Sequence, residues 1–364
     1  MNEANLIYKL AFKFIPNIGT VHAKTLISYC GGIEEVFKAK KSKLLKIPGI
    51  GEKKVNDLLK SDALKKAEHE YEKIKGKDIS LVFYLDEDYP KRLRNFHNSP
   101  LLLYIKGNKW DSTKRTVAII GTRRPTQYGI LECQKMVEAL QEFDVTILSG
   151  LAYGIDTNAH RKSVELSLRT YGILGNGIQT IYPATNRRLA AKMLEHGGLI
   201  SEFEMDAKPD RENFPMRNRI IAGLADAVIV VESDIKGGSI ITAEIANEYN
   251  KDVFAIPGML HQKMSSGCNH LIKTHKANLL TSAKDIGYIM GWEKTEKPVQ
   301  MTLGLELLTE EKQILSIIKD NKQISIDQIL YKSSIKLSNL SSTLLNLEFK
   351  GLIKSLPCKN YILS

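Results

Sequence analysis

The sequence predicts an α/β protein whose central part is a Rossmann-like, mostly parallel sheet, preceded and followed along the chain by helical segments. Three observations predict this fold class. Between residues 79 and 290, apolar runs of strand length alternate with helical patterns. These runs are continuous in Val, Ile and Leu, which is typical of strands buried on both faces in parallel sheets. Glycine or small polar residues follow several runs, as at the strand-to-helix turns of doubly wound folds.

The length of the chain indicates several domains. A chain of 364 residues is longer than one ordinary domain and can bury a sizeable core. We expect a helical domain over 1–78, the sheet domain over 79–290, a linker over 291–301 that is polar and contains Pro298, and a C-terminal domain over 302–364.

Charge and cysteine usage narrow the function classes. A formal net charge of +11 favours a polyanionic partner such as nucleic acid, although many proteins are basic without one. The four cysteines are far apart and show no CxxC or Cys/His spacing, which indicates neither a zinc site nor a disulfide framework. The chain shows no secretory signal and no run of about 18 apolar residues that spans a bilayer. We expect a cytoplasmic protein without membrane insertion, metal or cofactor.

The first segment combines helical periodicity with two short turns. Residues 15–19 (IPNIG) precede a helix expected over 23–29, and residues 47–51 (IPGIG) precede one expected over 53–59. The pair resembles tandem helix-hairpin-helix elements, although Asn17 stands where glycine is usual. In proteins with that motif the hairpin amides contact a DNA phosphate without reading bases, so the resemblance implies such a contact here. The alternative is that the hairpins only hold a small helical domain together.

The sheet domain is expected to contain six main strands, and residues 79–108 form an additional strand-rich start to it. The six strands are expected at 116–120, 145–148, 170–174, 199–201, 227–231 and 252–256.

The last segment has three helical patterns followed by two short strands, an order that resembles a winged helix. The helices are expected at 310–319, 325–330 and 338–350, and the strands at 352–356 and 360–363. The expected recognition helix contains only Lys350 as a base, and also Glu348. We therefore expect this domain to contribute little to DNA binding.

Four strand ends should lie at one edge of a parallel sheet. They are residues 121–125 (GTRRP), 149–156 (SGLAYGID), 174–177 (LGNG) and 236–239 (KGGS). Ligands of open α/β sheets bind outside the carboxyl ends of the strands, so these turns should converge on one crevice.

The last of these turns predicts a phosphate site. It opens a helix expected over 240–249, so that free backbone amides, a hydroxyl and an ammonium group can point at one anion. Arg217 and Arg219 add guanidinium groups from the preceding element. GxGxxG is absent after the first strand and no acidic residue ends the second, which disfavours a nicotinamide dinucleotide. GxxxxGK[ST] is absent too, so a P-loop nucleotidase has no support.

One aromatic residue and several acids are further candidates. Phe214 lies in a charged, proline-bearing loop expected over 211–215, where an exposed ring stacks on an unpaired base; the alternative is core packing. Asp156 and His160 have the spacing of a catalytic pair on a helix. More often, however, such an Asp caps the helix and such a His only forms hydrogen bonds within the fold. The other candidate acids are Glu202 and Glu244.

Seven motifs together resemble one known family. They are GTRR at 121–124, SGLAYGIDTNAH at 149–160, SEF at 201–203, FPMRNRIIAGLADAVIVVE at 214–232, GGSIITAEIA at 237–246, VFAIPG at 253–258 and SSGCNHLI at 265–272. In this order they closely resemble the DprA/Smf family of DNA-processing proteins. The resemblance implies a protein that binds single-stranded DNA, does no chemistry on it and helps to load the RecA recombinase onto incoming strands during natural transformation. It also implies a homodimer formed through the Rossmann-like domain.

The turns and the resemblance predict one set of DNA-binding residues and no catalytic residue. The set is Gly121, Arg123, Ser149, Gly150, Arg211, Phe214, Arg217, Asn218, Arg219, Lys236, Gly237, Gly238, Ser239 and Thr242. Three positions depart from the family pattern. Gly237 stands where the family has serine, residues 273–277 (KTHKA) lack a glycine, and Cys358 and Lys359 replace the glycine pair of the wing.

An enzyme stays open as an alternative. The order MxxRN…GGxxxxxE also resembles the phosphoribohydrolases of the lysine-decarboxylase-like group, in which an arginine and a glutamate cleave a nucleoside monophosphate. The corresponding residues here are Arg217 and Glu244, but Ile240 and Ile241 replace the Gly-Thr that this group requires next to the phosphate. A repair or chromatin-like scaffold is a further alternative.

Overall fold

The computed structural model describes residues 3–293, 308–321, 323–333, 335–350, 352–356 and 360–363. The chain divides into two compact units, Met1–Glu296 and Lys297–Ser364. The first unit contains both the helical segment and the sheet, and the division falls within the expected linker. Among the described residues, no helix is long and apolar enough to cross a membrane.

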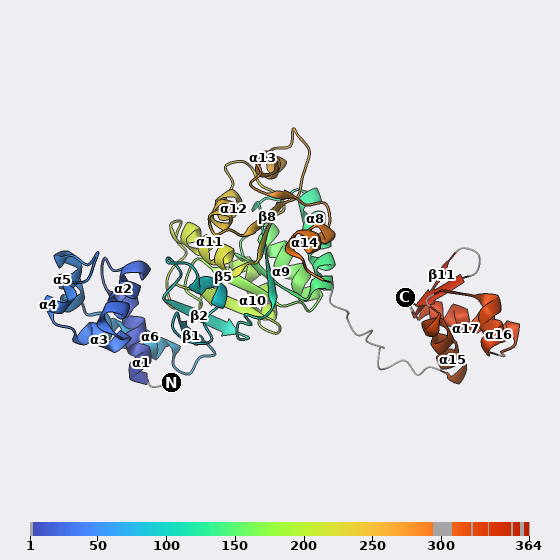
Figure 1. The fold of residues 1–364 in the computed structure, drawn as a ribbon, viewed down its shortest axis with the longest axis horizontal. Helices are drawn as coiled ribbons and strands as arrows, with labels where there is room; N and C mark the ends of the chain where they lie inside the picture. Colours follow the sequence, from blue (N-terminus) through green and yellow to red (C-terminus); the bar gives the residue numbers. More distant parts are fainter. Residues whose placement is uncertain are drawn as a thin grey trace. The chain divides into compact units, whose positions relative to one another are not determined.

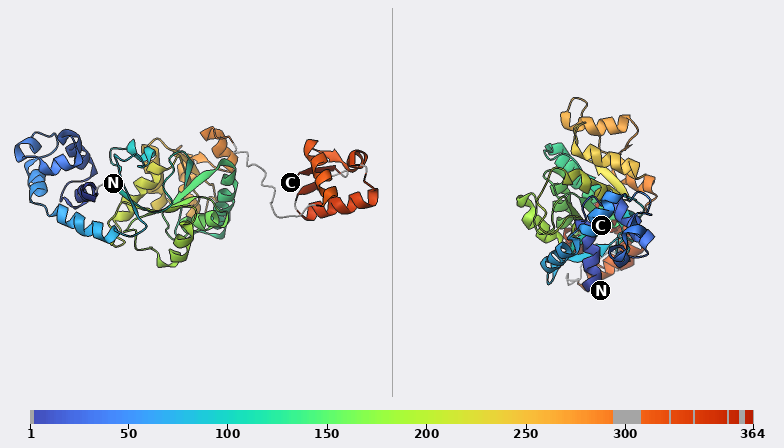
Figure 2. Two further views of the ribbon diagram at one scale, coloured as in Figure 1. Left: turned by 90° about the horizontal axis from the view of Figure 1, so that it is seen from below. Right: turned by 90° about the vertical axis from the view of Figure 1, so that its left-hand side faces the viewer.

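The chain begins with helices alone, drawn in blue in Figures 1 and 2. They are α1 (Glu3–Ala11), η1 (Phe12–Phe14), α2 (Thr20–Cys30), α3 (Ile33–Lys38), α4 (Lys41–Leu44), α5 (Glu52–Lys60) and α6 (Ala63–Ile74). The two expected turns precede α2 and α5, and their central residues share the left-handed conformation, with φ 59° at Asn17 and 77° at Gly49. Asparagine replaces glycine in the first turn because its short polar side chain tolerates this conformation. DNA contact at these turns stays a prediction.

The first unit contains a nine-stranded sheet of order β1-β2-β6-β5-β4-β3-β7-β8-β9. The six expected strands are present as β3 to β8, and 79–108 supplies β1 and β2. The strands are β1 (Ser80–Phe83), β2 (Leu102–Gly107), β3 (Arg115–Ile120), β4 (Val145–Ser149), β5 (Thr170–Leu174), β6 (Gly198–Ser201), β7 (Ala227–Val230), β8 (Asp252–Ala255) and β9 (Asn278–Leu279). In this spatial order, every pair of neighbouring strands from β6 through β5, β4, β3, β7 and β8 to β9 is parallel. The strand β2 pairs with β6 in the antiparallel direction. The predicted mostly parallel sheet is therefore confirmed.

The direction of chain winding changes at β3. From β3 the chain proceeds through β4, β5 and β6 on one side, and then returns to place β7 on the other side of β3. Such a reversal leaves a crevice at the carboxyl ends of the strands, because the two adjacent crossovers run to opposite faces of the sheet.

Helices cover both faces of the sheet (Figure 1). The helices α8 (Gln127–Ala139), α9 (Ile155–Glu165) and α14 (Ala283–Met290) contribute apolar side chains to one core, and α11 (Asn213–Leu224), α12 (Gly238–Glu248) and α13 (Ser266–Lys273) contribute to the core of the other face. The shorter α10 (Arg187–Met193) packs with the core that also includes the N-terminal helices. After α13, His275 takes φ 56° in the run that lacks the family's glycine.

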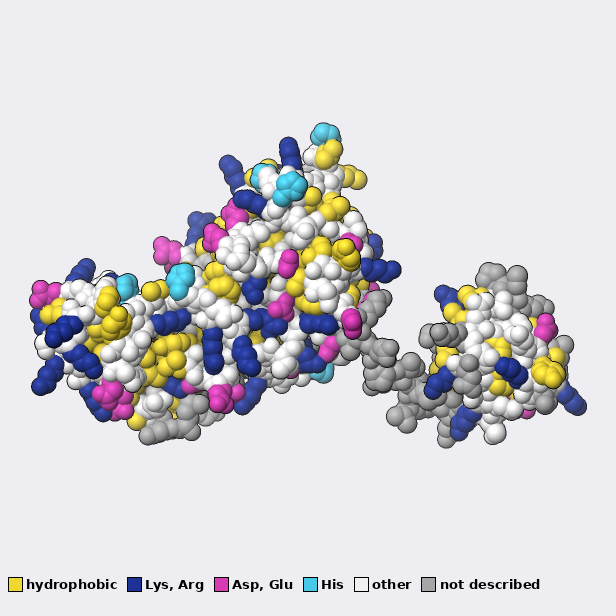
Figure 3. Space-filling view, in the orientation of Figure 1, with side chains coloured by type: hydrophobic (Ala, Val, Ile, Leu, Met, Phe, Trp, Pro, Cys, Tyr) yellow, Lys and Arg dark blue, Asp and Glu magenta, His cyan; other side chains and the backbone are white. Residues whose placement is uncertain are grey.

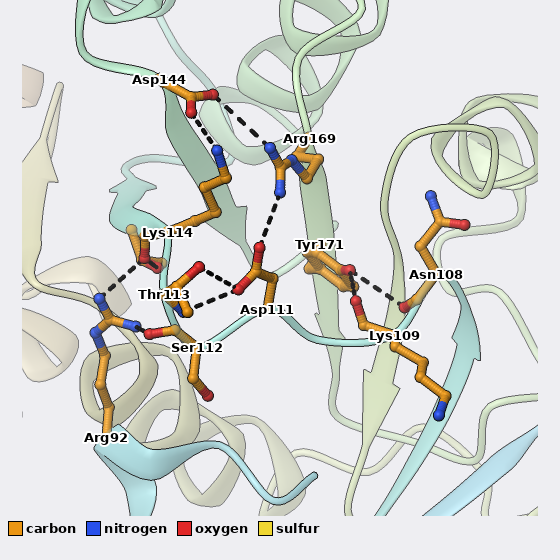
Figure 4. A network of polar contacts seen from close by, with 11 residues as sticks. Arg92, Asn108, Lys109, Asp111, Ser112, Thr113, Lys114, Asp144, Arg169 and Tyr171 are labelled. Carbon is orange, nitrogen blue, oxygen red and sulfur yellow. Dashed lines mark hydrogen bonds and ion pairs between the residues drawn. The ribbon is translucent and has the colours of Figure 1, made fainter. Parts of the chain in front are cut away.

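The amino ends of the central strands are tied together by ion pairs and hydrogen bonds, as Figure 4 shows. Arg169, just before β5, lies 3.4 Å from the carboxylate of Asp111 and 3.8 Å from that of Asp144. Tyr171 donates a hydrogen bond to the backbone oxygen of Lys109 at 2.8 Å. These partly exposed pairs add little free energy individually. They occupy the edge of the sheet opposite the carboxyl ends.

The second unit has the winged-helix arrangement. Its elements are α15 (Thr309–Asp320), β10 (Ile324–Ser325), α16 (Ile326–Ser333), α17 (Leu337–Phe349), β11 (Ile353–Leu356) and β12 (Asn360–Leu363). The strands form a sheet of order β10-β12-β11, so a third strand joins the expected two. The expected recognition helix, α17, ends at Phe349 and contains no Lys or Arg, and Lys350, which follows it, forms an ion pair with Glu311 at 2.7 Å. Cys358 and Lys359 lie outside the described residues.

Candidate nucleic-acid interface

A cleft of about 670 Å³ lies at the carboxyl edge of the sheet, at the reversal beside β3. The structure brings there residues from the turns after β3, β4 and β7 and from the start of α11. The sequence-predicted residues that line it are Gly121, Arg123, Arg211, Phe214, Arg217, Asn218, Gly237, Gly238, Ser239 and Thr242. Residues far apart in the sequence therefore meet where a doubly wound sheet holds its ligand.

Arg217 is the most unusual of these residues, because it lines the cleft with only 4% of its surface exposed. Its Nη1 donates to the backbone oxygen of Gly150 at 2.6 Å and to that of Ile173, and its Nε donates to Asn218 at 3.2 Å. Burial lowers the pKa of Arg217 to about 10, so the group stays charged at neutral pH. Among the described residues, no carboxylate forms an ion pair with it and Nη2 has no hydrogen-bond partner, although the buried carboxylate of Asp156 in the same cleft acts to raise its pKa. A buried charge without an ion pair suits an anionic ligand.

Two glycines at strand ends leave room for α11. A Cβ added at Gly150 would lie 2.5 Å from Nη1 of Arg217, and one at Gly175 would lie 2.8 Å from Cδ1 of Phe214. At Gly121 a Cβ would lie 2.6 Å from Cγ1 of Ile155, so internal packing requires glycine there as well. At Gly238, by contrast, nothing lies within 4 Å of an added Cβ, and the backbone faces open space.

Phe214 is half-buried on the wall of the cleft. The guanidinium carbons of Arg123 and Arg217 lie 5.3 Å and 5.9 Å from the centre of its ring. The prediction of a loop over 211–215 was wrong for its last three residues, because α11 begins at Asn213 and includes Phe214. Proline at 215 does not prevent this, since the first turn of a helix needs no intrahelical amide donor. The helix fixes the ring at the cleft, close to two guanidinium groups.

The start of α12 presents backbone amides to the same cleft. Gly237 is its N-cap residue and its carbonyl accepts the amide of Ile240 at 3.0 Å, which leaves the amides of Gly238 and Ser239 without a carbonyl partner among the described residues. The hydroxyl of Ser239 is already engaged, because it donates to the hydroxyl of Ser233 at 2.7 Å. Two acids also line the cleft: burial raises the pKa of Asp156, and Asp234 pairs with Lys263 at 3.5 Å. The amides and arginines, rather than the hydroxyl, are the groups that suit an anion.

Four sequence-predicted residues do not line the cleft. Ser149 is fully buried and donates to the backbone oxygen of Ile119 at 2.6 Å. Gly150 lies on a depression beside the cleft, and Lys236 is exposed outside it. Arg219 forms an ion pair with Glu202 and donates to the backbone oxygen of Asn98 at 2.7 Å. The predicted phosphate contact of Arg219 stays a prediction, which the pairing of its charge inside the protein disfavours.

Arg219 belongs to a buried cluster that the sequence did not reveal. We call Lys13, Glu202 and Arg219 the Glu202 cluster. Lys13 donates to the backbone oxygen of Glu202, and so connects the N-terminal helices to α11 through the end of β6. Burial raises the pKa of Glu202 and lowers that of Lys13. The cluster helps to hold α11 in place, because its charges are largely removed from water and stabilise one another.

The candidate catalytic residues do not assemble into a site. Glu244 is exposed on α12, pairs with Lys276 at 3.3 Å and does not line the cleft that contains Arg217. His160 is buried with Nδ1 at 2.7 Å from the hydroxyl of Thr170, and burial lowers its pKa to about 3. The carboxylate of Asp156 instead accepts the amide of Gly150 at 3.1 Å. Among the described residues, Asp156 and His160 therefore do not form a pair, and neither do Arg217 and Glu244.

Sequence reasoning did not single out Tyr153 and Tyr182 as site residues, although both stood inside motifs at strand ends. Tyr182 lines the cleft, and both line the depression beside it. The sequence feature that could have identified them is an aromatic residue within a polar, glycine-containing turn at a strand end.

Comparisons with known proteins match both units of the chain to one family. Residues 80–290 match the family model of DNA recombination-mediator protein A, and residues 304–357 match that of the DprA winged helix domain. Protein Smf of Synechocystis is 31% identical over 99% of this chain and 99% of its own length. DNA processing protein DprA of Streptococcus pneumoniae is 39% identical over 56% of this chain and 71% of its own length.

Solved structures agree with these matches. The X-ray structure of DprA from S. pneumoniae aligns with a TM-score of 0.65 and 30% identity, covering 81% of this chain and 99% of that chain. A structure of DNA processing protein A from Helicobacter pylori, solved to describe its single-stranded DNA binding mode, aligns with a TM-score of 0.53 and 28% identity, covering 60% of this chain and 99% of that chain.

Proposed function

The chain belongs to the DNA recombination-mediator protein A (DprA) family, and from this premise we propose that its cleft binds single-stranded DNA. The observation that carries the proposal is Arg217, a buried guanidinium in the cleft wall that forms no ion pair among the described residues and is influenced only from a distance by Asp156. A DNA phosphate in the cleft pairs with it directly. The similar protein from H. pylori, whose structure describes a single-stranded DNA binding mode, supports the choice of ligand.

Phosphates and bases have separate partners in this proposal. Arg123, Arg211, Arg217 and the first amides of α12 receive phosphates, which carry no sequence information. The ring of Phe214 stacks on a base, which must be unpaired to reach it. Figure 3 shows lysine and arginine side chains spread over the drawn face rather than gathered in one stripe. The selectivity for single strands is therefore assigned to the aromatic contact in the cleft, not to overall charge.

The proposed role is binding rather than chemistry. Among the described residues, Asp156 and His160 do not form a pair, and Glu244 lies outside the cleft that contains Arg217. We further propose, from the family, that the protein is cytoplasmic, protects incoming strands and loads RecA onto them.

We also propose self-association through the sheet domain. The edge strand β9, with its exposed Leu279, and the exposed Tyr288 on α14 support this proposal. Light scattering of the purified protein tests the dimer.

The central test compares single-stranded with duplex DNA of equal length at several salt concentrations. We expect single strands to bind tens-fold better, since stacking on Phe214 adds to phosphate contacts that both ligands share. Equal affinities for the two ligands would contradict the proposed function.

Neutralising two exposed arginines should change the salt dependence. In the double variant Arg123→Met and Arg211→Met, the slope of log affinity against log salt should fall by about 1.4, because each phosphate contact on a single strand contributes about 0.7. Fluorescence anisotropy titrations with a labelled oligonucleotide measure the slope. Arg187→Met, an exposed arginine on α10 outside the cleft, is the matched control and should leave the slope unchanged. A parental slope in the double variant would remove both residues from the interface.

Deleting residues 302–364 should leave single-strand affinity within a few-fold of the full chain. The cleft lies wholly in the first unit, α17 contains no Lys or Arg, and Lys350 just after it pairs with Glu311. The exposed face of α17 contains Leu345 and Phe349, which suit a protein partner better than a phosphate backbone. A tenfold loss in a truncated protein that remains folded by circular dichroism would show that the winged helix supplies a DNA surface.

A further inference from the structure

Three aromatic side chains from different segments gather beside the cleft. Tyr153 lies on the turn between β4 and α9, Tyr182 follows β5, and Phe214 lies in the first turn of α11. The rings of Tyr182 and Phe214 have centroids 6.0 Å apart and an interplanar angle of 35°. All three residues line one shallow depression next to the cleft, and Tyr182 and Phe214 also line the cleft itself. We call them the aromatic row.

The two tyrosines are not used by the fold. Tyr153 is 47% exposed and Tyr182 is 42% exposed. Within the described part of the chain, neither hydroxyl has a hydrogen-bond partner. Large aromatic side chains that leave this much surface in water at a binding cleft are suited to stacking against a planar ligand.

The segments that carry the tyrosines are fixed to each other. The buried amide of Asn186 donates to the backbone oxygen of Leu151 and to the hydroxyl of Thr157, both at 2.9 Å. Asn176, also buried, donates to the backbone oxygen of Thr180 at 2.6 Å and closes the turn before Tyr182. These bonds reduce the conformational entropy that a ligand must remove when it binds, so the rings form a preorganised surface.

The shape and charge of the depression indicate stacking rather than enclosure. Its volume is about 10 Å³, which is room for about one water molecule and not for a base. Arg123 is the one charged residue among those that line it. A ligand there must therefore lie on the faces of the rings, with most of its phosphates elsewhere.

We propose that Tyr182 and Tyr153 extend the base-stacking surface that begins at Phe214, so that consecutive unpaired bases stack on the rings of the aromatic row. This inference rests on the proposed single-strand binding of the cleft. The phosphates lie against Arg217 and the start of α12, and the bases lie on the rings. Because every base has a π-face, the row selects unpaired bases and not a particular sequence.

The test measures the affinity of the full-length protein for a labelled oligothymidylate and for the same strand with its central bases removed. Tyr182→Ala should weaken binding of the normal strand about five-fold or more, which is the lower end of the effect of losing one stacked base. The salt slope should stay parental, because no phosphate contact is lost. Tyr182→Phe should bind like the parent, since the ring face is kept. Tyr331→Ala, at an exposed tyrosine of the second unit, is the matched control and should have no effect.

The outcomes separate this inference from the proposed function. If Phe214→Ala weakens binding but the folded Tyr182→Ala variant matches the parent, the extended row is wrong and single-strand binding stands. If Tyr182→Ala weakens the base-free strand equally, or Tyr182→Phe loses as much as Tyr182→Ala, then the residue does not act by stacking and the inference is overturned. If the parent protein does not prefer single strands at all, the proposed function itself is wrong.

Discussion

Replacing Arg219 by methionine is expected to lower the free energy of unfolding of the first unit by about 3–5 kcal/mol, the usual cost of leaving a buried charge without its partner. Glu202 is buried and its Oε2 is bound by Arg219, while its Oε1 has no partner among the described residues. The salt slope of single-strand binding should stay unchanged in protein that remains folded, because Arg219 does not line the cleft.

Urea unfolding followed by tryptophan fluorescence measures this effect in the first unit. The chain has two tryptophans, Trp110 and Trp292, and both lie in that unit. Arg211→Met, at an exposed arginine of the cleft, is the matched control: its stability should stay near the parent's while its salt slope falls. Adding Glu202→Met to Arg219→Met should recover part of the lost stability, since the unpaired carboxylate is removed but Lys13 then loses the charge of Glu202. A stable Arg219→Met variant with a reduced salt slope would restore the phosphate contact that the sequence predicted.

Replacing Phe214 by alanine is expected to weaken single-strand binding by about 1–3 kcal/mol, the contribution of one stacked base. The affinity for duplex DNA should change much less, because paired bases do not reach the ring. Anisotropy titrations with both ligands at one salt concentration measure the difference. The preference for single strands should shrink accordingly.

Phe214→Leu separates stacking from packing. Leucine keeps an apolar side chain near Gly175, where the ring now lies, but has no aromatic face. We expect Phe214→Leu to lose nearly as much single-strand affinity as Phe214→Ala. Parental binding by the leucine variant would show that the ring serves only to position α11 against the strand ends.

Much of the fold could be predicted from the sequence because its signals are local. Continuous apolar runs marked β3 to β8, and the glycine turns after them marked the edge at which the cleft lies. The strands β9 and β10 could not be predicted, because each has two residues and shows no periodicity. Their place in a sheet depends on a neighbouring strand rather than on their own residues.

The sequence interpretation placed the glycines at the strand ends, where they lie, but it gave only part of the reason why glycine is needed there. It treated them as backbone that approaches a phosphate. The structure shows that Gly121 and Gly150 are required by Ile155 and Arg217, which leave no room for a side chain. Only contacts between distant segments reveal such a requirement, whereas Gly238 faces open space as the anion site requires.

By itself, the sequence determined the α/β fold, the family and the segments that form the cleft, because these depend on hydrophobic pattern and on motifs of adjacent residues. The tertiary structure alone decided which charges are available to a ligand. Arg217 and Arg219 are two residues apart in one motif, and the sequence assigned both to phosphate. On a helix, two residues are separated by about 200° around the axis. One guanidinium therefore faces the cleft without a carboxylate partner among the described residues, and the other is paired with Glu202 inside the protein.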